Sequence, residues 1–441
     1  MFNYIHVKNY KSLGDVTFDL RNKTRMPKKL AIVFGDNGIG KSNLASVFYF
    51  LSKSLTTMGV RDLIQDFLKD LPPDVPDEIL MSLLKDNYQS MPDLIKKAKM
   101  VQSDENLFIE YGFRINGING EYRLEMNDEE IVSESLEYKL NQRKGTYFSF
   151  TPSQKKMSAV VFKDADLVKD LFEQSAKFWG KHSFLAILLH DFNDKSQEYY
   201  EGKLSDNFID VLHEFRSIYC KINFGNTMEK GMEPMMDWGV GPSGYMAPKN
   251  ESMLDFAEKV LNRFLPVINH DIKRVYYKRK IRKSKLHYQL YEQKLINGKV
   301  REISFALEST GTCHVLNLLP YLVEAVKGSV VVIDEFDFGM HELLTKKLIQ
   351  SLYNQMQGQL IVTTHDTNNF ELDIPPEAYY VINEDENGFK KIYCVLKIDN
   401  KINPKNNIRK QYLSGKYHGI PQNASIDFQA LLQMIEGHRG E

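Results

Sequence analysis

The sequence of 441 residues predicts an α/β protein: a mixed sheet flanked by helices, an antiparallel β subdomain and an inserted helical arm. Three observations lead to this fold class. Short apolar runs at 30–34, 330–333 and 359–364 predict buried parallel strands. Apolar and polar side chains alternate along 107–126, which is typical of an antiparallel hairpin. Helical periodicity extends from about 164 to 265.

Composition and charge exclude several classes of protein. Apolar residues make up 42% of the chain and charged residues 26%, which excludes a disordered or collagen-like chain. The 57 basic and 58 acidic residues give a formal charge of −1, so any nucleic-acid contact must come from a local patch. No apolar run is long enough to span a membrane, and the three cysteines suggest neither disulfides nor a metal site. Without an export signal at its start, the chain is expected to be soluble and cytoplasmic.

The elements expected in the first half of the chain follow from local patterns. Residues 2–20 alternate like two strands, and 30–34 form a buried strand that runs into a glycine-rich turn. A helix is expected over 44–55. Residues 60–103 have a mostly helical pattern, which the proline-rich stretch Leu71–Pro76 interrupts.

The second half begins after a β-rich block whose last strand is expected at 146–150. A Gly/Met/Pro-rich stretch at 223–250 predicts a loop within the helical region, and strand patterns return at 274–303. These patterns divide the chain into a nucleotide-binding lobe (1–163), a helical arm (164–270), a C-terminal lobe (271–400) and a tail (401–441).

The most specific motif is Gly35-Asp36-Asn37-Gly38-Ile39-Gly40-Lys41-Ser42, which fits the pattern G-x-x-x-x-G-K-[ST] of a phosphate-binding loop. It lies between a predicted strand and a predicted helix, as that mechanism requires. Its glycines let successive backbone N–H groups surround phosphates without a Cβ clash. Lys41 is expected to reach the β- and γ-phosphates of a nucleotide, and the Ser42 hydroxyl to bind Mg²⁺.

Two further strand ends carry candidate site residues. A β-branched run at 329–333 ends in Asp334 and Glu335, at the sheet edge where open α/β sheets bind ligands. Asp334 is expected to hold Mg²⁺, and Glu335 to accept a proton from the attacking water. The run Gln359–Thr364 ends in His365, which is expected to contact the γ-phosphate or orient the water.

Together these motifs resemble the ATP-binding-cassette ATPases of the chromosome-maintenance and double-strand-break-repair branch. Val7–Ser12 is similar to the first strand and turn of that branch, Gly35–Asn43 to its Walker A motif and Asp334-Glu335 to its Walker B motif. Asp337 matches the D-loop aspartate and His365 the switch histidine. Glu308-Ser309-Thr310-Gly311-Thr312 departs from the transporter signature and, like the tail 412–421, resembles compact ATPases of abortive-infection and overcoming-lysogenisation-defect systems.

This resemblance implies binding of ATP and Mg²⁺, with nucleotide contacts from Gly35, Asn37, Gly38, Gly40, Lys41, Ser42 and Asn43. It also implies that Ser309 and Gly311 cap the γ-phosphate held by a second copy, so the chain is expected to form a homodimer or higher homo-oligomer. The implied context is bacterial anti-phage defence, with ATP state gating a separately encoded effector, a nuclease or a toxin. The alternatives are a DNA-repair ATPase with a separate nuclease, and a slowly hydrolysing scaffold that holds an effector inactive. A detached transporter cassette fits least well.

Two features depart from the resemblance. The glutamine of the Q-loop has no clear counterpart: Gln154 is the best candidate, although an exposed polar residue is the simpler interpretation. Relatives of the overcoming-lysogenisation-defect type carry a Toprim nuclease domain after the ATPase. The roughly forty residues that follow the last predicted strand are too few for such a domain.

Basic residues are concentrated in 273–285, interleaved with Tyr276 and Tyr277. This pattern fits two alternatives. One is a strand with a charged face that contacts a nucleic-acid backbone, and the other is a solvated edge strand protected by its charges against aggregation.

Overall fold

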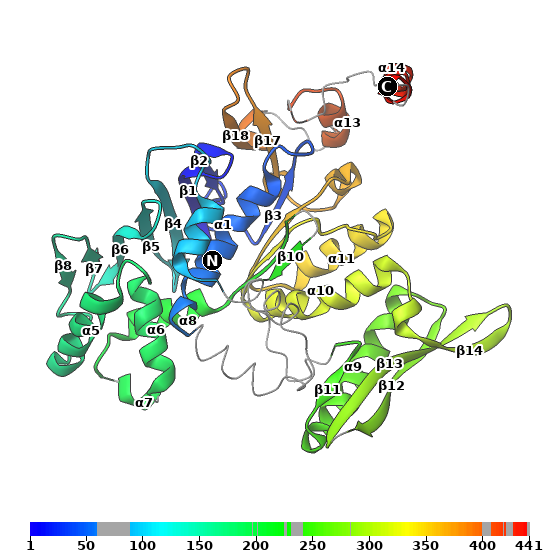
Figure 1. Ribbon diagram of the computed structural model, residues 1–441, viewed down its shortest axis with the longest axis horizontal. Coiled ribbons are helices and arrows are strands. Elements are labelled where there is room, and N and C mark those ends of the chain that lie inside the picture. Colours follow the sequence, from blue (N-terminus) through cyan, green and yellow to red (C-terminus); the bar gives the residue numbers. More distant parts are fainter. Residues whose placement is uncertain are drawn as a thin grey trace.

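The computed structural model describes residues 1–59, 89–195, 197–200, 202–224, 227–230, 241–282, 284–398, 407–417, 419 and 427–438. Within these ranges the strands form a central sheet, an antiparallel sheet and a smaller outer sheet (Figure 1). The predicted α/β class, with a mixed sheet, flanking helices and an antiparallel β subdomain, is confirmed. No described helix combines the length and the apolar character that crossing a bilayer requires.

The central sheet is mostly parallel and carries the predicted strands at its middle. Helix α1 (Lys41–Ser54) packs on one face, and α10 (Thr310–Lys327) and α11 (Glu342–Gln355) pack on the other. Every residue of β3, β15 and β16 is buried, which explains their continuous apolar sequences. In sheet order the strands are β10 (Thr227–Lys230), β9 (Ile218–Phe224), β15 (Val330–Ile333), β16 (Gln359–Thr363), β3 (Leu30–Phe34), β17 (Tyr379–Glu384) and β18 (Lys390–Cys394).

The antiparallel sheet lies on the other side of α1 and shares a hydrophobic core with it. Its strands, in order, are β2 (Leu13–Asp19), β1 (Phe2–Tyr10), β4 (Leu107–Ile115), β5 (Ile118–Met126), β6 (Ile131–Leu140), β7 (Arg143–Phe150) and β8 (Lys155–Met157). The helices α4 (Met91–Ala98), α5 (Ala165–Phe178), α6 (Phe184–Asp194), α7 (Gln197–Tyr200) and α8 (Asp206–Arg216) contribute to the same half of the molecule.

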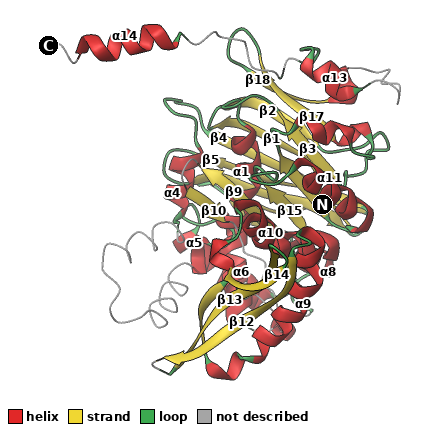
Figure 2. Cartoon of the chain, turned by 90° about the vertical axis from the view of Figure 1, so that its right-hand side faces the viewer, coloured by secondary structure: helices red, strands yellow, loops and turns green. Residues whose placement is uncertain are grey.

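The outer sheet projects from the body together with α9 (Ser252–Ile268) (Figures 1 and 2). Its strands are β11 (Ser243–Met246), β13 (Lys285–Ile296), β12 (Ile272–Arg282) and β14 (Lys299–Ser304), with β13 pairing to all three others. Beyond β18 follow α12 (Val395–Ile398), α13 (Ile408–Leu413) and α14 (Phe428–His438), and α14 extends away from the body (Figure 2).

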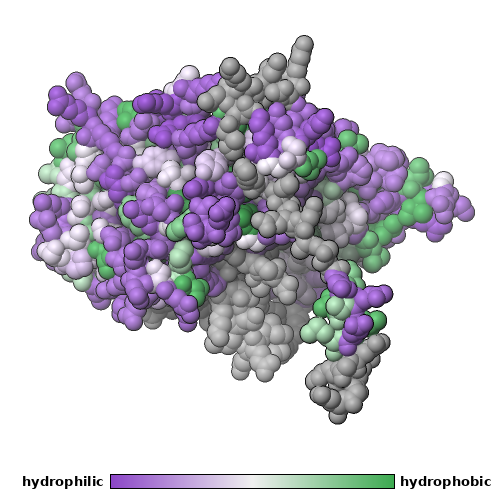
Figure 3. Space-filling view, turned by 90° about the horizontal axis from the view of Figure 1, so that it is seen from above, coloured by the Kyte–Doolittle hydropathy of each residue, from purple (hydrophilic) through white to green (hydrophobic). Residues whose placement is uncertain are grey.

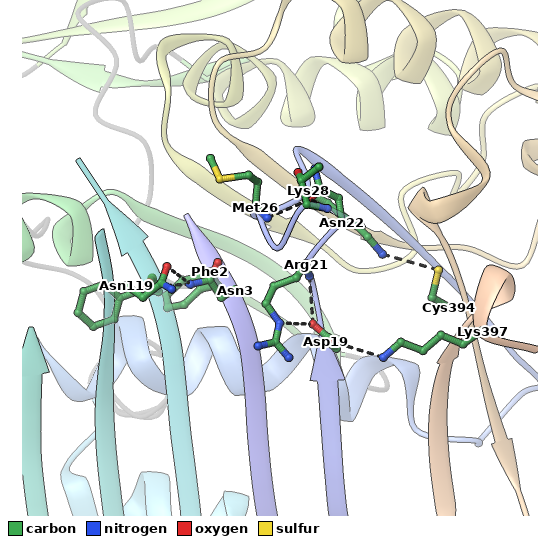
Figure 4. A network of polar contacts seen from close by, with 12 residues as sticks. Phe2, Asn3, Asp19, Arg21, Asn22, Met26, Lys28, Asn119, Cys394 and Lys397 are labelled. Atoms are coloured by element: carbon green, nitrogen blue, oxygen red, sulfur yellow. Dashed lines mark hydrogen bonds and ion pairs between the residues drawn. The ribbon is translucent and has the colours of Figure 1, made fainter. Parts of the chain in front are cut away.

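Short polar links tie the beginning of the chain to its C-terminal part (Figure 4). Asp19, at the end of β2, binds Arg21 at 2.7 Å and Lys397 of α12 at 3.1 Å. Burial alone would raise the pKa of Asp19, but the hydrogen bonds from these two cations outweigh it and lower the pKa to about 2. Nearby, the Lys28 ammonium lies 3.6 Å from the Cys394 sulfur. The described C-terminal strands are therefore held against the N-terminal hairpin.

The structure corrects the predicted run of helices between 164 and 265. Residues 218–224 form β9, which pairs in parallel with β15 inside the central sheet. The stretch 223–250, expected to be a loop, includes β10 and β11 among its described residues. Most of the helical pattern expected at 60–103 and the stretch Leu71–Pro76 lie outside the described residues, apart from α4. The lobe boundaries at 163, 270 and 400 stay predictions.

Candidate active site

The glycine-rich loop joins β3 to α1 and is closed around a lysine side chain. The Lys41 ammonium donates hydrogen bonds to the carbonyl oxygens of Gly35 and Asp36, both at 2.9 Å. Gly38 and Gly40 have φ angles of 76° and 111°, in the region that favours glycine. These backbone angles turn the loop tightly, and α1 begins at Lys41.

The turn of the first hairpin supports this loop. The Asn43 side-chain amide donates a hydrogen bond to the Ser12 hydroxyl at 2.7 Å. A Cβ on Gly40 would lie only 3.2 Å from the same hydroxyl, so the close approach also favours glycine there. Asn37, in contrast, is exposed at the mouth of the loop. The Lys11–Ser12 turn between β1 and β2 therefore borders the candidate phosphate site.

Asp334 follows β15 and is buried, with 2% of its surface exposed. It accepts hydrogen bonds from the hydroxyl of Thr363, at the end of β16, and from that of Ser42. Burial raises the pKa of Asp334, although these hydrogen bonds oppose the shift. Two hydroxyls and a carboxylate thus meet where α1, β15 and β16 come together.

Glu335 has a strained backbone beside this cluster. Its φ angle is 50°, which is uncommon for a residue other than glycine. Its N–H donates to the Thr363 hydroxyl at 2.9 Å, and its carboxylate accepts a hydrogen bond from the Asn223 side chain at 3.0 Å. The Asn223 backbone N–H also donates to Asp334, at 3.3 Å. Asn223, near the end of β9, therefore donates hydrogen bonds to the carboxylates of both Asp334 and Glu335.

His365 lies just beyond β16, with its Nδ1 atom 3.4 Å from the Lys41 ammonium. Burial and the charge of Lys41 lower the pKa of His365. The pKa of Lys41 is itself lowered to about 8, chiefly by burial, while Asp334, Asp36 and Glu335 oppose the shift. The site therefore holds a lysine whose charge is sensitive to its surroundings near neutral pH.

Ser309 and Gly311 open α10 beside the turn that follows Glu335. Ser309 caps the helix, its hydroxyl accepting a hydrogen bond from the Thr312 N–H at 3.2 Å. A Cβ on Gly311 would lie 2.3 Å from the Gly339 carbonyl oxygen, so this glycine permits close backbone packing. The His314 ring lies 3.2 Å from the Phe336 carbonyl oxygen. The start of α10 is therefore fitted to residues 336–340.

A buried group of charges connects this helix start to the outer sheet. Glu308, directly before Ser309, forms an ion pair with Lys294 of β13 and accepts a hydrogen bond from the Ser309 N–H at 3.0 Å. Glu292, also on β13, is fully buried, and burial next to Glu308 raises its pKa to about 8. Burial next to Glu308 therefore favours the protonated form of Glu292, which removes the charge repulsion between the two glutamates.

The structure brings most of the predicted site residues together and separates others. Lys41, Ser42, Asp334, Glu335 and His365 converge at one edge of the central sheet. Among the described residues, no hydrogen bond joins Ser309 or Gly311 to the glycine-rich loop. Gln154 is exposed in the Thr151–Gln154 turn between β7 and β8, where Thr151 and Gln154 bond to each other. Its exposure agrees with the simpler interpretation of Gln154 as an exposed polar residue, and no hydrogen bond among the described residues joins it to the candidate site.

Sequence reasoning missed Asn223, Thr363 and His314. Thr363 lies in a recognised strand, two residues before His365, and its position alone suggested a place at the sheet edge. Asn223 and His314 carried no such signal, because the strand before Asn223 was not recognised and a single histidine in a helix is usually structural.

The donor atoms of the site suit a magnesium ion. Mg²⁺ prefers oxygen ligands, commonly one or two carboxylates together with phosphate oxygens. The Ser42 hydroxyl and the Asp334 carboxylate supply such oxygens, and they already lie within hydrogen-bonding distance of each other. The described residues contain no group of three or more His, Cys, Asp or Glu side chains that would form a separate metal site.

Comparison with known proteins gives a family match to part of the chain. Residues 235–373 match a family described as "AAA domain, putative AbiEii toxin, Type IV TA system". The matched segment contains the candidate signature residues, both acids and His365, and the glycine-rich loop lies outside it. No curated protein matches the chain.

Two solved structures of SMC heads are also similar to the chain. The SMC head domain from Thermotoga maritima has 13% sequence identity and a TM-score of 0.36, covering 89% of this chain and 98% of that one. An SMC head bound to the C-winged helix domain of ScpA has 12% identity and a TM-score of 0.40, covering 89% and 96%.

Proposed function

We propose that this chain is a Mg²⁺-dependent ATPase whose site lies at the carboxyl edge of the central sheet. The observation that carries this proposal is the convergence of three strand ends: β3 leads into the loop before Lys41, β15 into Glu335 and β16 into His365. Parallel strands present their carboxyl ends at one edge, where open α/β sheets bind ligands.

The residues around Lys41 are suited to hold the triphosphate. The backbone N–H groups of 38–42 would surround the phosphates of a bound nucleotide, and the start of α1 would add its dipole. Lys41 binds the β- and γ-phosphates, while Ser42 and Asp334 hold Mg²⁺. When bound, Mg²⁺ neutralises negative charge that develops on the phosphate oxygens.

Glu335 is the proposed general base. A carboxylate within hydrogen-bonding reach of the attacking water can accept its proton. The Asn223 side chain fixes one Glu335 oxygen, and the strained backbone directs the carboxylate from the strand end. His365, next to Lys41, contacts the γ-phosphate or orients the water.

Two copies of the chain would complete each site. Ser309 is exposed at the N-terminus of α10, and among the described residues nothing bonds it to the glycine-rich loop of its own chain. A second copy related by a two-fold axis would bring Ser309 and the N–H of Gly311 to the γ-phosphate, in an arrangement that needs only one chain type. ATP would then hold the pair together, and hydrolysis would loosen it.

This ATP-driven pairing would serve as a switch for a separately encoded effector in anti-phage defence. Support comes from the resemblance of the signature and tail to abortive-infection ATPases, and from the match of 235–373 to the AbiEii-type family. Proteins of that description belong to toxin–antitoxin systems, which fits a nuclease or toxin as the effector.

A complementation experiment tests the composite site. Lys41→Ala should abolish ATP binding, and Ser309→Arg should retain ATP binding while ATP-dependent pairing and turnover fall together. A mixture of the two variants should restore at most one working site per dimer, measured as steady-state hydrolysis alongside mass by light scattering. Full hydrolysis by a monomeric Ser309→Arg chain would contradict the proposal.

A second candidate, a DNA-repair ATPase that works with a separate nuclease, is favoured by the exposed Lys280 and Arg282 of β12. Stimulation of ATP turnover by duplex DNA, without any effect of a neighbouring effector protein, would support this candidate over the defence switch.

A further inference from the structure

The outer sheet has two unlike faces. On the face toward α9, Val275, Tyr277 and Leu290 are buried against the apolar side of that helix. We call the opposite side the outer face. Strand pairing assigns residues to it, because directly opposed residues of antiparallel strands share a face. The pairs are Tyr276 with Tyr291, Lys278 with Gln289, Lys280 with His287, Arg282 with Lys285, and Tyr245 with His287.

Strand position divides the basic run of 273–285 between these faces. Arg279 points toward α9 and forms ion pairs with Glu251, Asp255 and Glu258 at 3.2, 2.7 and 2.9 Å. The charge of Arg279 is therefore paired with carboxylates of this chain and does not belong to the outer face. Lys283 lies outside the described residues.

The outer face itself is strongly basic. Arg274, Lys278, Lys280, Arg282 and Lys285 all belong to it by register, against a single carboxylate among its described residues, Glu302. Glu302 forms an ion pair with Lys278 and accepts a hydrogen bond from the Tyr276 hydroxyl. An edge strand that is protected against aggregation needs charged residues, but it does not need its cations to lie on one face of the sheet.

Aromatic rings lie among these cations. The Tyr276 and Tyr291 rings are 6.4 Å apart with 27° between their planes, and the Tyr245 and His287 rings are 4.8 Å apart. The Lys278 ammonium lies 4.0 Å from the Tyr291 ring centre. Tyr245 is 61% exposed, which leaves its ring accessible to a ligand. Figure 3 shows hydrophobic and hydrophilic residues side by side on the projecting outer sheet, at the right of the view.

We propose that the outer face binds single-stranded nucleic acid, with its cations on the phosphates and its rings against unpaired bases. Rings on a sheet surface can stack bases, and stacking tolerates any base because every base has a flat face. In a duplex those faces are covered by neighbouring base pairs, so the tyrosines would contribute little. An acidic peptide would use the cations but not the rings. The proposal depends neither on ATP hydrolysis nor on the choice of effector.

The test uses the full-length protein and fluorescence anisotropy with a labelled oligothymidylate of about 20 nucleotides, longer than a typical single-domain site. A duplex of equal length and polyglutamate serve as the other two probes. We expect the single strand to bind most tightly, with an affinity that falls steeply as salt rises.

Three sets of variants separate the contributions. Tyr276→Ala combined with Tyr291→Ala should weaken single-strand binding by roughly tenfold or more, with little effect on the duplex. Lys280→Glu combined with Arg282→Glu should weaken binding and flatten its salt dependence. Glu302→Gln should tighten binding by a few-fold, to about the degree expected from removing one repelling charge.

The matched control is Lys163→Glu combined with Lys169→Glu, which makes the same change in net charge on exposed residues around α5, far from the outer sheet. Melting temperature and ATP affinity establish that each variant is folded. An equal loss of binding in the control, tighter binding of the duplex or of polyglutamate, or no binding by the wild-type chain at low salt would each overturn the proposal.

Discussion

The central sheet and the outer sheet use their strands in opposite ways. In the central sheet both faces are covered by helices, so β3, β15 and β16 are buried throughout and polar groups can appear only where each strand ends. The outer sheet is covered on one face by α9, so the first half of β12 has buried residues (Ile272, Val275 and Tyr277) separated by more exposed ones. A sheet covered on both faces can thus present polar functional side chains only at its edge, whereas a sheet covered on one face can also present them along its strands.

The largest effect is expected from a substitution at the edge of the central sheet, where the comparison places the chemistry. Glu335→Gln should lower ATP hydrolysis by about 10²–10⁴-fold, because the proposed general base is lost. ATP binding should persist, since Lys41 and the loop are untouched. Single-turnover kinetics with an equilibrium binding measurement would separate the two. Turnover at the wild-type rate would mean that another group accepts the proton.

The next prediction tests whether close backbone packing at the start of α10 requires glycine at position 311. Gly311→Ala would place a Cβ 2.3 Å from the Gly339 carbonyl oxygen, a backbone atom that cannot rotate away. We expect a loss of about 1–3 kcal/mol in the free energy of unfolding, measured in urea. Gly14→Ala in β2 is the control: no atom lies within 4 Å of its added Cβ, so its effect should be far smaller. Equal effects would mean that the close approach to Gly339 is not what requires glycine.

The pH dependence of ATP affinity should report the charge of Lys41. Its pKa is lowered to about 8 by burial, while bound phosphates favour the protonated form. Affinity should therefore change little below pH 8 and fall by up to about tenfold per unit above it. Lys41→Arg keeps its charge over this range, so its affinity should stay level, whatever its absolute value. A similar decline in that variant would assign the effect to another group.

The smallest expected effect lies on the inner face of the outer sheet. Arg279→Met removes three ion pairs to α9 and should cost about 1 kcal/mol of stability, because partly exposed ion pairs contribute little individually. Lys280→Met, on the outer face, should change the stability less. Thermal melting of both variants checks this order, and a larger loss at Lys280 would show that the assignment of the two faces is wrong.

The same contrast explains which parts of the fold were predictable. Apolar runs identified β3, β15 and β16, and the motif spacing then located Lys41, Asp334 and Glu335. β9 escaped because its buried residues include Lys221, which interrupts the apolar pattern of a central strand. Without β9, Asn223 had no predicted place beside Glu335. The sequence predicted β12 as a strand with a charged face. It did not predict that Arg279 would form ion pairs with acids of α9, because these pairs depend on packing between segments that the sequence alone did not pair.

The order of strands in the central sheet has a consequence for how the protein is made. β3, which leads into the glycine-rich loop, lies between β16 and β17, strands that follow it by more than three hundred residues in the chain. Near the start of the chain, the backbone of Phe2 is held by the Gln359 side chain through hydrogen bonds of 2.8 and 2.9 Å. During synthesis on the ribosome, the apolar residues of β3 therefore remain uncovered until its neighbours β16 and β17 have been translated. A nascent or truncated chain without β16 and β17 would thus lack a finished nucleotide site, and production of the protein would depend on protecting β3 until these two strands have been translated.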